Sequence, residues 1–225
     1  SNSNESLSLR RDFPIHETWK LTFVADALNA FNLVRFGMPN LNITNTPGTI
    51  INWPGFSIAK GETTQFIQQS ASSTVLNRVI TADLLTPSLN RSTIEGSLLS
   101  NGRVFLINPN GVIFGAGAIV STAGLVVSTL ALSDADFLAN RYRFTDTPGA
   151  FGITNQGSIT TSTGGSVYLI APSVTNTGIV RSDGGEIILA AGKSVELVNA
   201  NSPDVRVQIT APDNQGSMKV LRKVG

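Results

Sequence analysis

Two neighbouring stretches of this chain follow nearly the same plan, and this repeat constrains the fold more than any single residue does. Residues 155–171 and 176–190 each carry Asn-x-Gly, then a Gly-Gly pair, then an apolar run, at offsets of 21, 20 and 20 residues. Each unit predicts a short strand, a tight glycine turn and a second strand. A period near twenty without helical spacing is typical of a β-solenoid, in which a coil buries its apolar face by stacking on the next coil. Residues 119–124 match residues 179–184 at a shift of 60, which predicts the same register three periods upstream.

Composition agrees with one β domain and excludes several classes of protein. The 225-residue chain is 41% hydrophobic and 14% charged, which is enough apolar sequence for a continuous core. Its net charge is +1 and its basic residues are scattered, so a nucleic-acid-binding surface is not expected. The lack of cysteine excludes disulfides and thiolate chemistry. No run of about 18 apolar residues predicts a membrane-spanning helix. The start also lacks the features of a signal peptide, so we expect an exported protein of this sequence to be the mature form.

Strand and turn signals divide the chain into three parts. Residues 1–40 are expected to form a partly flexible cap on the solenoid, with residues 1–12 frayed. Within 13–37, the alternation from Trp19 to Phe23 predicts a strand, and the apolar positions 24, 27, 28 and 31 fit a turn of helix. Residues 41–200 are expected to form the β-helix, with an excursion at 134–150, and residues 201–225 a C-terminal coil or second excursion. The side chains expected to point inward and stack are Val167, Leu169, Ile187 and Leu189.

An ordered set of motifs resembles a known family. It contains Asn-Trp-x-x-Phe-Ser-Ile at 52–58, Val-Leu-Asn-Arg-Val at 75–79, Val-Phe-Leu-Ile-Asn-Pro-Asn-Gly at 104–111 and Gly-Leu-Val-x-Ser-Thr at 124–129. Together these motifs resemble the filamentous-haemagglutinin-type secretion domain of two-partner-secretion exoproteins, over roughly residues 41–200. The motif-matching residues that we expect to be structural are Asn52, Trp53, Phe56, Asn77, Arg78, Asn101 and Gly102.

The resemblance implies both a fold and a function. The fold is all-β, a right-handed parallel β-helix with capping strands. The function is to address a large exoprotein to its dedicated outer-membrane TpsB-type transporter in a Gram-negative bacterium, and to nucleate folding after export. The partner would be the transporter's periplasmic domains, and the protein would be secreted or carried on the cell surface after passing the periplasm. The fragment would be monomeric and would use no cofactor, and a host-cell ligand would be bound by the full exoprotein.

Two regions depart from the family pattern. A second Asn-Pro-Asn motif is absent near residues 68–73, where this chain has a Ser-rich stretch, as one subgroup does. Residues 13–40 also differ from the usual lead-in, so targeting residues are not carried over to them.

The motif Asn108-Pro109-Asn110-Gly111 allows two interpretations. Proline fixes φ near about −65°, and Asn-Gly readily takes positive φ, so the motif predicts a type I or type II turn that closes a coil. The other interpretation is direct recognition of the asparagine amides by the transporter. A rigid turn also presents amides well, so the two roles are compatible.

Other patterns predict no catalytic or cofactor site. Gly-x-Gly at 115–117, with two Asp about twenty residues on, imitates a dinucleotide fingerprint, but Val120 replaces the third glycine and β repeat follows. His16 is the only histidine, so neither a His-rich metal site nor a Ser-His-Asp triad is expected.

The acidic residues raise the question of a calcium site. Asp134 with Asp136, or Asp183 with Glu186, could hold Ca²⁺ together with backbone carbonyls. We favour solvated loop charges, because calcium-binding solenoids repeat their Asp and position 162 is Ser. We expect Arg141 and Arg143 to screen the acids at 134 and 136.

Two other functions are compatible with a β-helix. One is an adhesive surface that binds a host ligand directly, which saturable binding of this fragment to host cells would reveal. The other is a polysaccharide-cleaving enzyme, which needs carboxylates on adjacent coils. Residues 150–180 contain no Asp, Glu, Lys or Arg, so no catalytic wall can be built there and we expect no enzyme.

Overall fold

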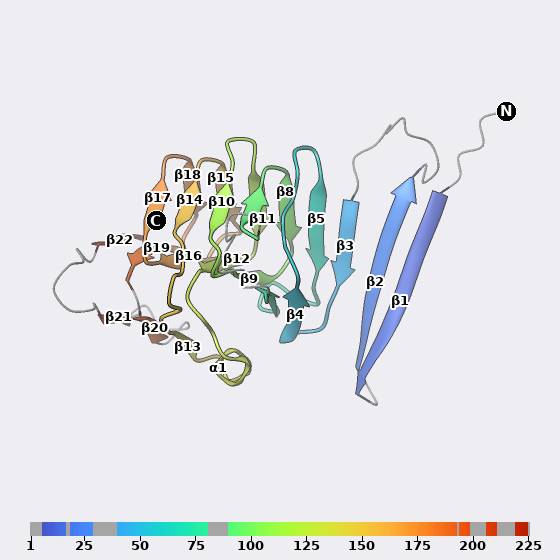
Figure 1. Cartoon of the computed structure of the whole chain (residues 1–225), viewed down its shortest axis with the longest axis horizontal. Helices are drawn as coiled ribbons and strands as arrows, with labels where there is room; N and C mark the ends of the chain where they lie inside the picture. The colour runs from blue at the N-terminus through green and yellow to red at the C-terminus, as the bar shows by residue number, and fades with distance from the viewer. Residues whose placement is uncertain are drawn as a thin grey trace.

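The computed structural model describes residues 6–16, 19–28, 40–80, 90–192, 194–198, 206–210 and 219–224. Its strands form three long sheets, which we call A, B and C, and a small fourth sheet, D (Figure 1). In spatial order, sheet A contains β1 (Ser6–His16), β2 (Trp19–Leu28), β3 (Asn40–Thr44), β5 (Thr63–Ile67), β8 (Ser97–Ser100), β11 (Ile119–Thr122), β15 (Ser158–Thr161) and β18 (Ile179–Ser182).

Sheets B, C and D complete the architecture, with one short helix, α1 (Asp134–Leu138). In spatial order, sheet B contains β22 (Lys219–Val224), β19 (Glu186–Ala191), β16 (Val167–Ala171), β12 (Gly124–Ser128), β9 (Arg103–Ile107), β6 (Thr74–Val79) and β4 (Thr49–Trp53). Sheet C contains β17 (Val174–Asn176), β14 (Ile153–Asn155), β10 (Val112–Phe114) and β7 (Ser92–Ile94). Sheet D contains β13 (Tyr142–Phe144), β20 (Ser194–Val198) and β21 (Arg206–Thr210).

The chain visits sheets A, B and C in turn. β8, β9 and β10 lie in the three sheets, and β11 and β12 then return to sheets A and B. Each of these strands pairs in parallel with its equivalent one coil away, as Val120 does with Leu98 on one side and Ile159 on the other. Figure 1 shows the resulting stack of coils from β3 to β19. This arrangement is a parallel β-helix, so the predicted fold class is confirmed.

The predicted register of the repeat is present, although one count was wrong. Asn155 pairs with Asn176, at the predicted offset of 21 residues. Residues 60 positions apart are also in register, because Val120 pairs with Ile159 and Ile159 pairs with Val180. That path takes two coils and not three periods. Its first step spans 39 residues because an excursion is inserted between β12 and β14, whereas the second spans 21.

Alternate side chains of each coil point into a narrow apolar core. Val167 and Leu169 are fully buried, and Ile187 and Leu189 pack against the same core from the last coil, so the predicted inward set is confirmed. Burying each large apolar side chain contributes about 1.5–3 kcal/mol. Each coil repeats these contacts with its neighbours, so stacking stabilises the whole solenoid.

Glycines at the corners allow the coils to approach closely. A Cβ on Gly185 would overlap the carbonyl oxygen of Gly165, and a Cβ on Gly178 would overlap that of Gly157. Gly184 has a φ of +66°, a conformation that other residues rarely adopt. The recurring Gly-Gly and Asn-x-Gly pairs therefore mark two corners of the coil.

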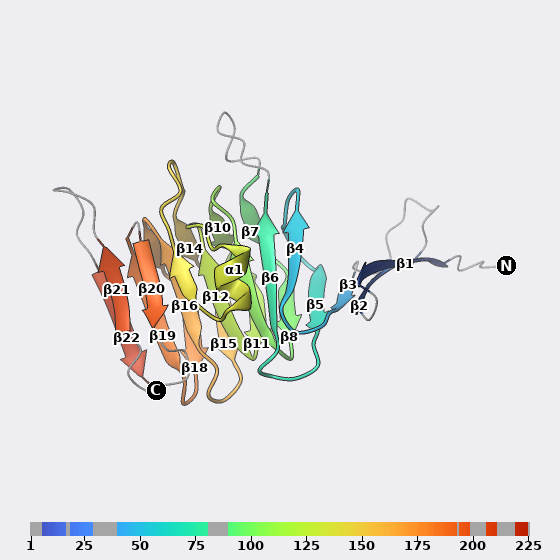
Figure 2. The ribbon, with the colours of Figure 1, turned by 90° about the horizontal axis from the view of Figure 1, so that it is seen from below.

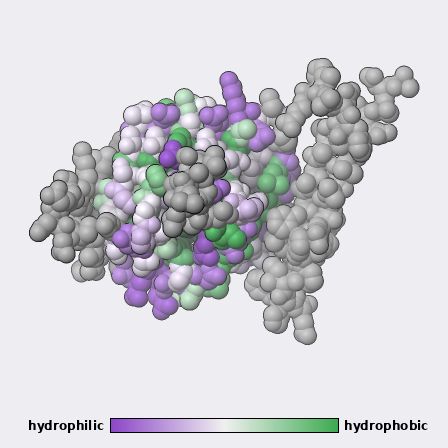
Figure 3. All heavy atoms as spheres, in the orientation of Figure 1, coloured by the Kyte–Doolittle hydropathy of each residue, from purple (hydrophilic) through white to green (hydrophobic). Residues whose placement is uncertain are grey.

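The sheets differ in what covers their outer faces. Sheet A exposes a row that includes Ile119 and Ile179 with Ser158 between them. In sheet B both faces are apolar, so Phe105 points outward from a strand whose neighbour Leu106 points inward. Such continuous apolar runs are typical of parallel strands buried on both sides. Figure 3 shows hydrophilic and hydrophobic side chains interspersed over the described part of one face of the molecule.

An excursion covers the outer face of sheet B. Between β12 and β14 the chain leaves the stack, forms α1 and β13, and packs over sheet B (Figure 2). β13 pairs antiparallel with β20, not with any strand of sheets A, B or C. The excursion predicted at 134–150 therefore lies outside the coils, as expected.

The N-terminal strands correct two expectations. Residues 6–12 belong to β1 and are not frayed, and residues 24–28 continue β2 as strand where a helical turn was predicted. β2 pairs antiparallel with both β1 and β3, and these non-local backbone hydrogen bonds override the local helical spacing. Residues 29–39 lie outside the described residues. At the other end, β22 pairs antiparallel with β19.

Candidate functional site

The motif Asn108–Gly111 forms the corner between β9 and β10. The amide of Gly111 donates to the carbonyl of Asn108 at 3.0 Å, which closes a four-residue turn. A type II turn requires positive φ at its third residue. Asn110 is not among the described residues with positive φ, whereas Gly111 has φ +99°. The turn is therefore type I, one of the two types predicted.

The side chain of Asn108 lies inside the coil. It is 0% exposed, and its Nδ2 donates to the carbonyl of Asn90 at 2.8 Å and to Oγ of Ser92 at 2.9 Å. Its Oδ1 accepts the amide of Asn110 at 2.9 Å. These bonds tie the corner after β9 to the start of β7 one coil away. Asn110 is only 4% exposed, so neither amide group is displayed to a partner of the folded domain.

The outer side of this corner is formed by other residues. The carbonyl of Pro109 accepts the amide of Phe151 at 2.9 Å. Phe151 is 38% exposed, and the guanidinium of Arg91 lies 5.7 Å from its ring centroid. Sequence reasoning missed these two residues, because they join the corner from coils on either side of the motif.

Trp53 and Asn77 form a polar ladder across sheet B, in which Trp53 is half-buried and Asn77 fully buried. The indole nitrogen of Trp53 donates to Oδ1 of Asn77 at 3.0 Å, and Nδ2 of Asn77 donates to the carbonyl of Phe105 at 3.3 Å. These bonds link β4, β6 and β9. Phe56 packs edge-on against Trp53 with ring centroids 5.4 Å apart. Asn52, by contrast, is exposed on β4.

Asn101 and Gly102 shape another corner, between β8 and β9. The Oδ1 of Asn101 accepts the amide of Gln68 at 2.7 Å, and its Nδ2 donates to the carbonyl of Gln68 at 2.7 Å, so one side chain imitates a strand neighbour. A Cβ on Gly102 would collide with the Gln68 side chain. The Ser-rich stretch after Gln68 forms its own turn, in which Oγ of Ser73 accepts a hydrogen bond from the backbone amide of Ser70 at 3.1 Å.

Arg78 connects the coil stack to the excursion. Its guanidinium donates to the carbonyl of Leu132 at 2.7 Å and pairs with Asp134 at 2.7 Å. Together these two bonds fix the entry of α1, whose N-cap, Ser133, accepts the amide of Asp136 at 3.1 Å. The sequence motif contained Arg78, but only the fold shows what it holds.

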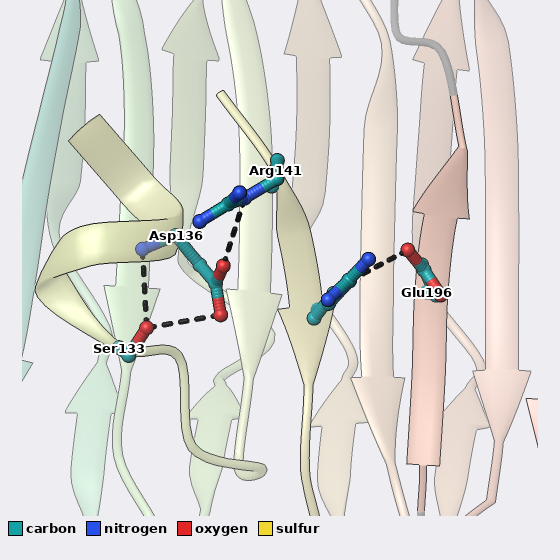
Figure 4. A network of polar contacts seen from close by, with 5 residues as sticks. Ser133, Asp136, Arg141 and Glu196 are labelled. Atoms are coloured by element: carbon teal, nitrogen blue, oxygen red, sulfur yellow. Dashed lines mark hydrogen bonds and ion pairs between the residues drawn. The ribbon is translucent and has the colours of Figure 1, made fainter. Parts of the chain in front are cut away.

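Two arginines of the excursion form ion pairs (Figure 4). Arg141 contacts Asp136 at 3.1 Å, as expected. Arg143 is paired with Glu196 at 2.8 Å because β13 pairs with β20, and Asp136 is a weaker electrostatic partner of the same guanidinium.

The structure gives no support to the rival chemistry. β10 runs into β11 through Gly115 and Gly117, so a strand and not a helix follows the Gly-x-Gly pair. Asp183 pairs with Arg181 at 3.1 Å, and Glu186 accepts the hydroxyl of Tyr168 at 3.1 Å. His16 lies in β1.

The described parts of the chain lack two features, a cluster of metal-ligating side chains and a membrane-spanning helix. No cluster of three His, Cys, Asp or Glu side chains occurs there that could hold a metal ion. Over the same ranges, no helix is long and apolar enough to cross a membrane.

Three comparisons identify what the chain resembles. A family model described as the TPS secretion domain matches residues 37–222. The crystal structure of the HMW1 secretion domain from Haemophilus influenzae superposes with a TM-score of 0.68 at 37% identity, covering 76% of this chain and 44% of that one. Two heme/hemopexin-binding proteins of Haemophilus influenzae are 42% and 38% identical over 84 and 95 residues, or 37% and 42% of this chain. The matched segments are only 8% and 10% of those two proteins.

Proposed function

This chain belongs to the TPS secretion domain family, and on that premise we propose that it addresses a longer exoprotein to one dedicated outer-membrane transporter. The observation that carries the proposal is that the family match, over residues 37–222, contains the whole coil stack from β3 to β19. In two-partner secretion the exoprotein crosses the periplasm of a Gram-negative bacterium and meets a TpsB-type transporter. We propose that the periplasmic domains of such a transporter bind this chain.

The coil stack suits export followed by folding. Most strands pair with strands one coil away, about twenty to forty residues distant in sequence. Coils of this kind can add one at a time, each stabilised by its neighbour. The first coils to leave the transporter would then template the rest.

Within this function, the Asn108–Gly111 corner acts mainly as a structural turn. The amides that a partner could recognise by hydrogen bonds are already bonded inside the coil. A contact with the transporter would therefore use the chain before this corner closes. We expect loss of the turn to reduce export through lost folding.

Binding, and not catalysis, is the activity that the charges support. Asp134, Asp136 and Asp183 are each engaged by an arginine at 2.7–3.1 Å. A glycosidase needs two carboxyl groups facing one bond, one of them free to give a proton. The heme and hemopexin binding in the names of two relatives belongs to proteins far longer than the matched segment.

Titration calorimetry against the purified periplasmic domains of the chain's cognate TpsB-type transporter tests the proposal. We expect a dissociation constant in the micromolar range, which corresponds to a binding free energy of about −8 kcal/mol, because a chain that is later released cannot be held much more tightly. Folded and urea-unfolded chain are both titrated. The absence of heat or competition at high micromolar concentration with either form would refute the proposal.

A further inference from the structure

Asparagine is followed directly by glycine at only two places in the sequence, Asn101-Gly102 and Asn110-Gly111. The two pairs stand at the two ends of β9, the strand that lies between β6 and β12 in sheet B. Asparagine before glycine is the arrangement most open to deamidation, because glycine has no Cβ to shield its backbone nitrogen or to restrict the chain. Both corners of one central strand therefore carry a chemically labile side-chain amide.

Deamidation of an Asn-Gly pair joins two groups of neighbouring residues. The backbone nitrogen of the glycine loses its proton and attacks the side-chain carbonyl carbon of the asparagine. A new C–N bond closes a succinimide ring, and the side-chain nitrogen takes up a proton and leaves as ammonia. One water molecule then opens the ring to aspartate, or to isoaspartate, in which the main chain runs through the side-chain carbons. Nothing is oxidised or reduced, and water is the only co-reactant.

In the folded chain, hydrogen bonds hold both reacting groups of the first pair. The amide of Gly102 donates to Oγ of Ser100 at 3.0 Å, which opposes the loss of its proton. The side-chain amide of Asn101 is bonded twice to the backbone of Gln68, through Oδ1 at 2.7 Å and through Nδ2 at 2.7 Å. These two bonds direct the side chain toward the neighbouring coil. Asn101 is exposed, so its protection depends on hydrogen bonds and not on burial.

The second pair is held by the turn and is also buried. The amide of Gly111 donates to the carbonyl of Asn108 at 3.0 Å, and the amide of Asn110 donates to Oδ1 of Asn108 at 2.9 Å. These bonds fix the backbone on both sides of Asn110. Because Asn110 is only 4% exposed, the water that opens the succinimide is also kept away. Reaction at this pair therefore requires the corner to open.

From these contacts we propose that Asn101 and Asn110 are modification sites, at which spontaneous deamidation proceeds in the unfolded chain and is suppressed by folding. A chain that waits unfolded before export is modified at the two ends of β9, whereas a chain that has folded is protected. This chemistry is independent of whether a transporter binds the chain.

The product of the reaction does not fit the corner at Asn101. Aspartate replaces the Nδ2 donor by an oxygen, so a negatively charged atom would face the carbonyl of Gln68 in place of a 2.7 Å hydrogen bond. Isoaspartate also adds a methylene to the main chain beside Gly102, where a Cβ would already collide with the Gln68 side chain. A chain modified before folding therefore loses the contact that aligns this corner with the coil of β5.

Peptide mass mapping of the full chain measures the reaction. Folded chain in sodium chloride and unfolded chain in guanidinium chloride are incubated at the same mildly alkaline pH, and the conversion of Asn101 and Asn110 is followed with time. We expect both residues to react at least tenfold faster in the unfolded chain. Asn77 precedes an arginine, whose side chain shields the backbone nitrogen, so it serves as the internal control and should remain an amide in both samples.

A substitution in the folded chain tests the local hydrogen bond. Ser100→Ala removes the acceptor of the Gly102 amide, so Asn101 should react at least fivefold faster in the folded variant while Asn110 keeps its rate. Ser121→Ala, at an exposed position of β11, is the matched control and should change neither rate. An unchanged rate at Asn101, or an equal rise at Asn110, would overturn the protection assigned to this bond.

The effect of the product on folding is tested with Asn101→Asp. This variant should have a lower unfolding midpoint and refold with lower yield than wild type, whereas Asn52→Asp, at an exposed position of β4, should match wild type. Equal conversion in folded and unfolded chain, or no conversion in either, would overturn the proposal. Equal midpoints for the two Asp variants would overturn its consequence for folding. Transporter binding is measured separately by calorimetry, so its failure is distinguishable from each of these results.

Discussion

Replacing Asn108 by Ala should cost the domain about 3 kcal/mol of unfolding free energy. The substitution removes three hydrogen bonds of 2.8–2.9 Å and leaves their partners on Asn90, Ser92 and Asn110 without this bond. Leaving a buried polar group unsatisfied costs about 1–3 kcal/mol. Ser92 is fully buried and Asn110 nearly so, whereas Asn90 is half-buried and water can replace its bond. At roughly 2–4 °C per kcal/mol for a chain of this size, the thermal midpoint should fall by about 9 °C.

The assay compares this variant with Asn52→Ala. Asn52 is exposed, so its replacement should change stability by no more than about 0.5 kcal/mol. Thermal unfolding of the purified chain is followed by circular dichroism, and export is measured in culture supernatants with the transporter co-expressed. We expect the Asn108 variant to lose both stability and export. If its midpoint equals that of Asn52→Ala while export still falls, the transporter reads the side chain directly and the structural interpretation is wrong.

Three further perturbations test other parts of the fold. Burial raises the pKa of Tyr142 and Tyr168, against the smaller opposing effects of Arg103 at Tyr142 and of a hydrogen bond with Ser166 at Tyr168. Their contribution to stability is therefore present below pH about 10 and lost as pH rises through the folded pKa. These are the only tyrosines, so tyrosinate absorbance should titrate above pH 10. Tyr→Phe at both positions should flatten the alkaline fall in stability. Titration of this absorbance near pH 10 would contradict the burial of the two side chains. Gly185→Ala should prevent normal coil stacking, because its Cβ would overlap a carbonyl of the previous coil, whereas Gly55→Ala meets nothing within 4 Å and should be tolerated; similar unfolding midpoints would exclude that close approach. Arg78→Ala should increase proteolysis of residues 131–145 while β9 and β12 keep their hydrogen-exchange protection. Unchanged cleavage would show that the contacts of Arg78 with Leu132 and Asp134 do not hold the excursion against sheet B.

Local patterns in the chain predicted the parts of the fold that repeat from coil to coil. The repeat predicted the pairing of Asn155 with Asn176 in sheet C and of Val167 with Ile187 in sheet B, because each coil repeats the same local requirements for turn and core. The turn at Asn108 was predicted from proline and glycine chemistry alone. Its burial was not, since the carbonyl of Asn90 and the hydroxyl of Ser92 come from another coil.

The all-β class, the coil period and the inward side chains follow from local patterns, because periodicity and glycine position act over a few residues and recur in every coil. Three other features appear only in the folded chain: two coils and not three periods separate residues 119 and 179, β2 continues as strand through Leu28, and Arg143 meets Glu196. Each of these depends on pairing between segments distant in the chain. No local pattern encodes such a choice, since the free energy of a strand pair belongs to both partners and to the apolar surface that they cover together.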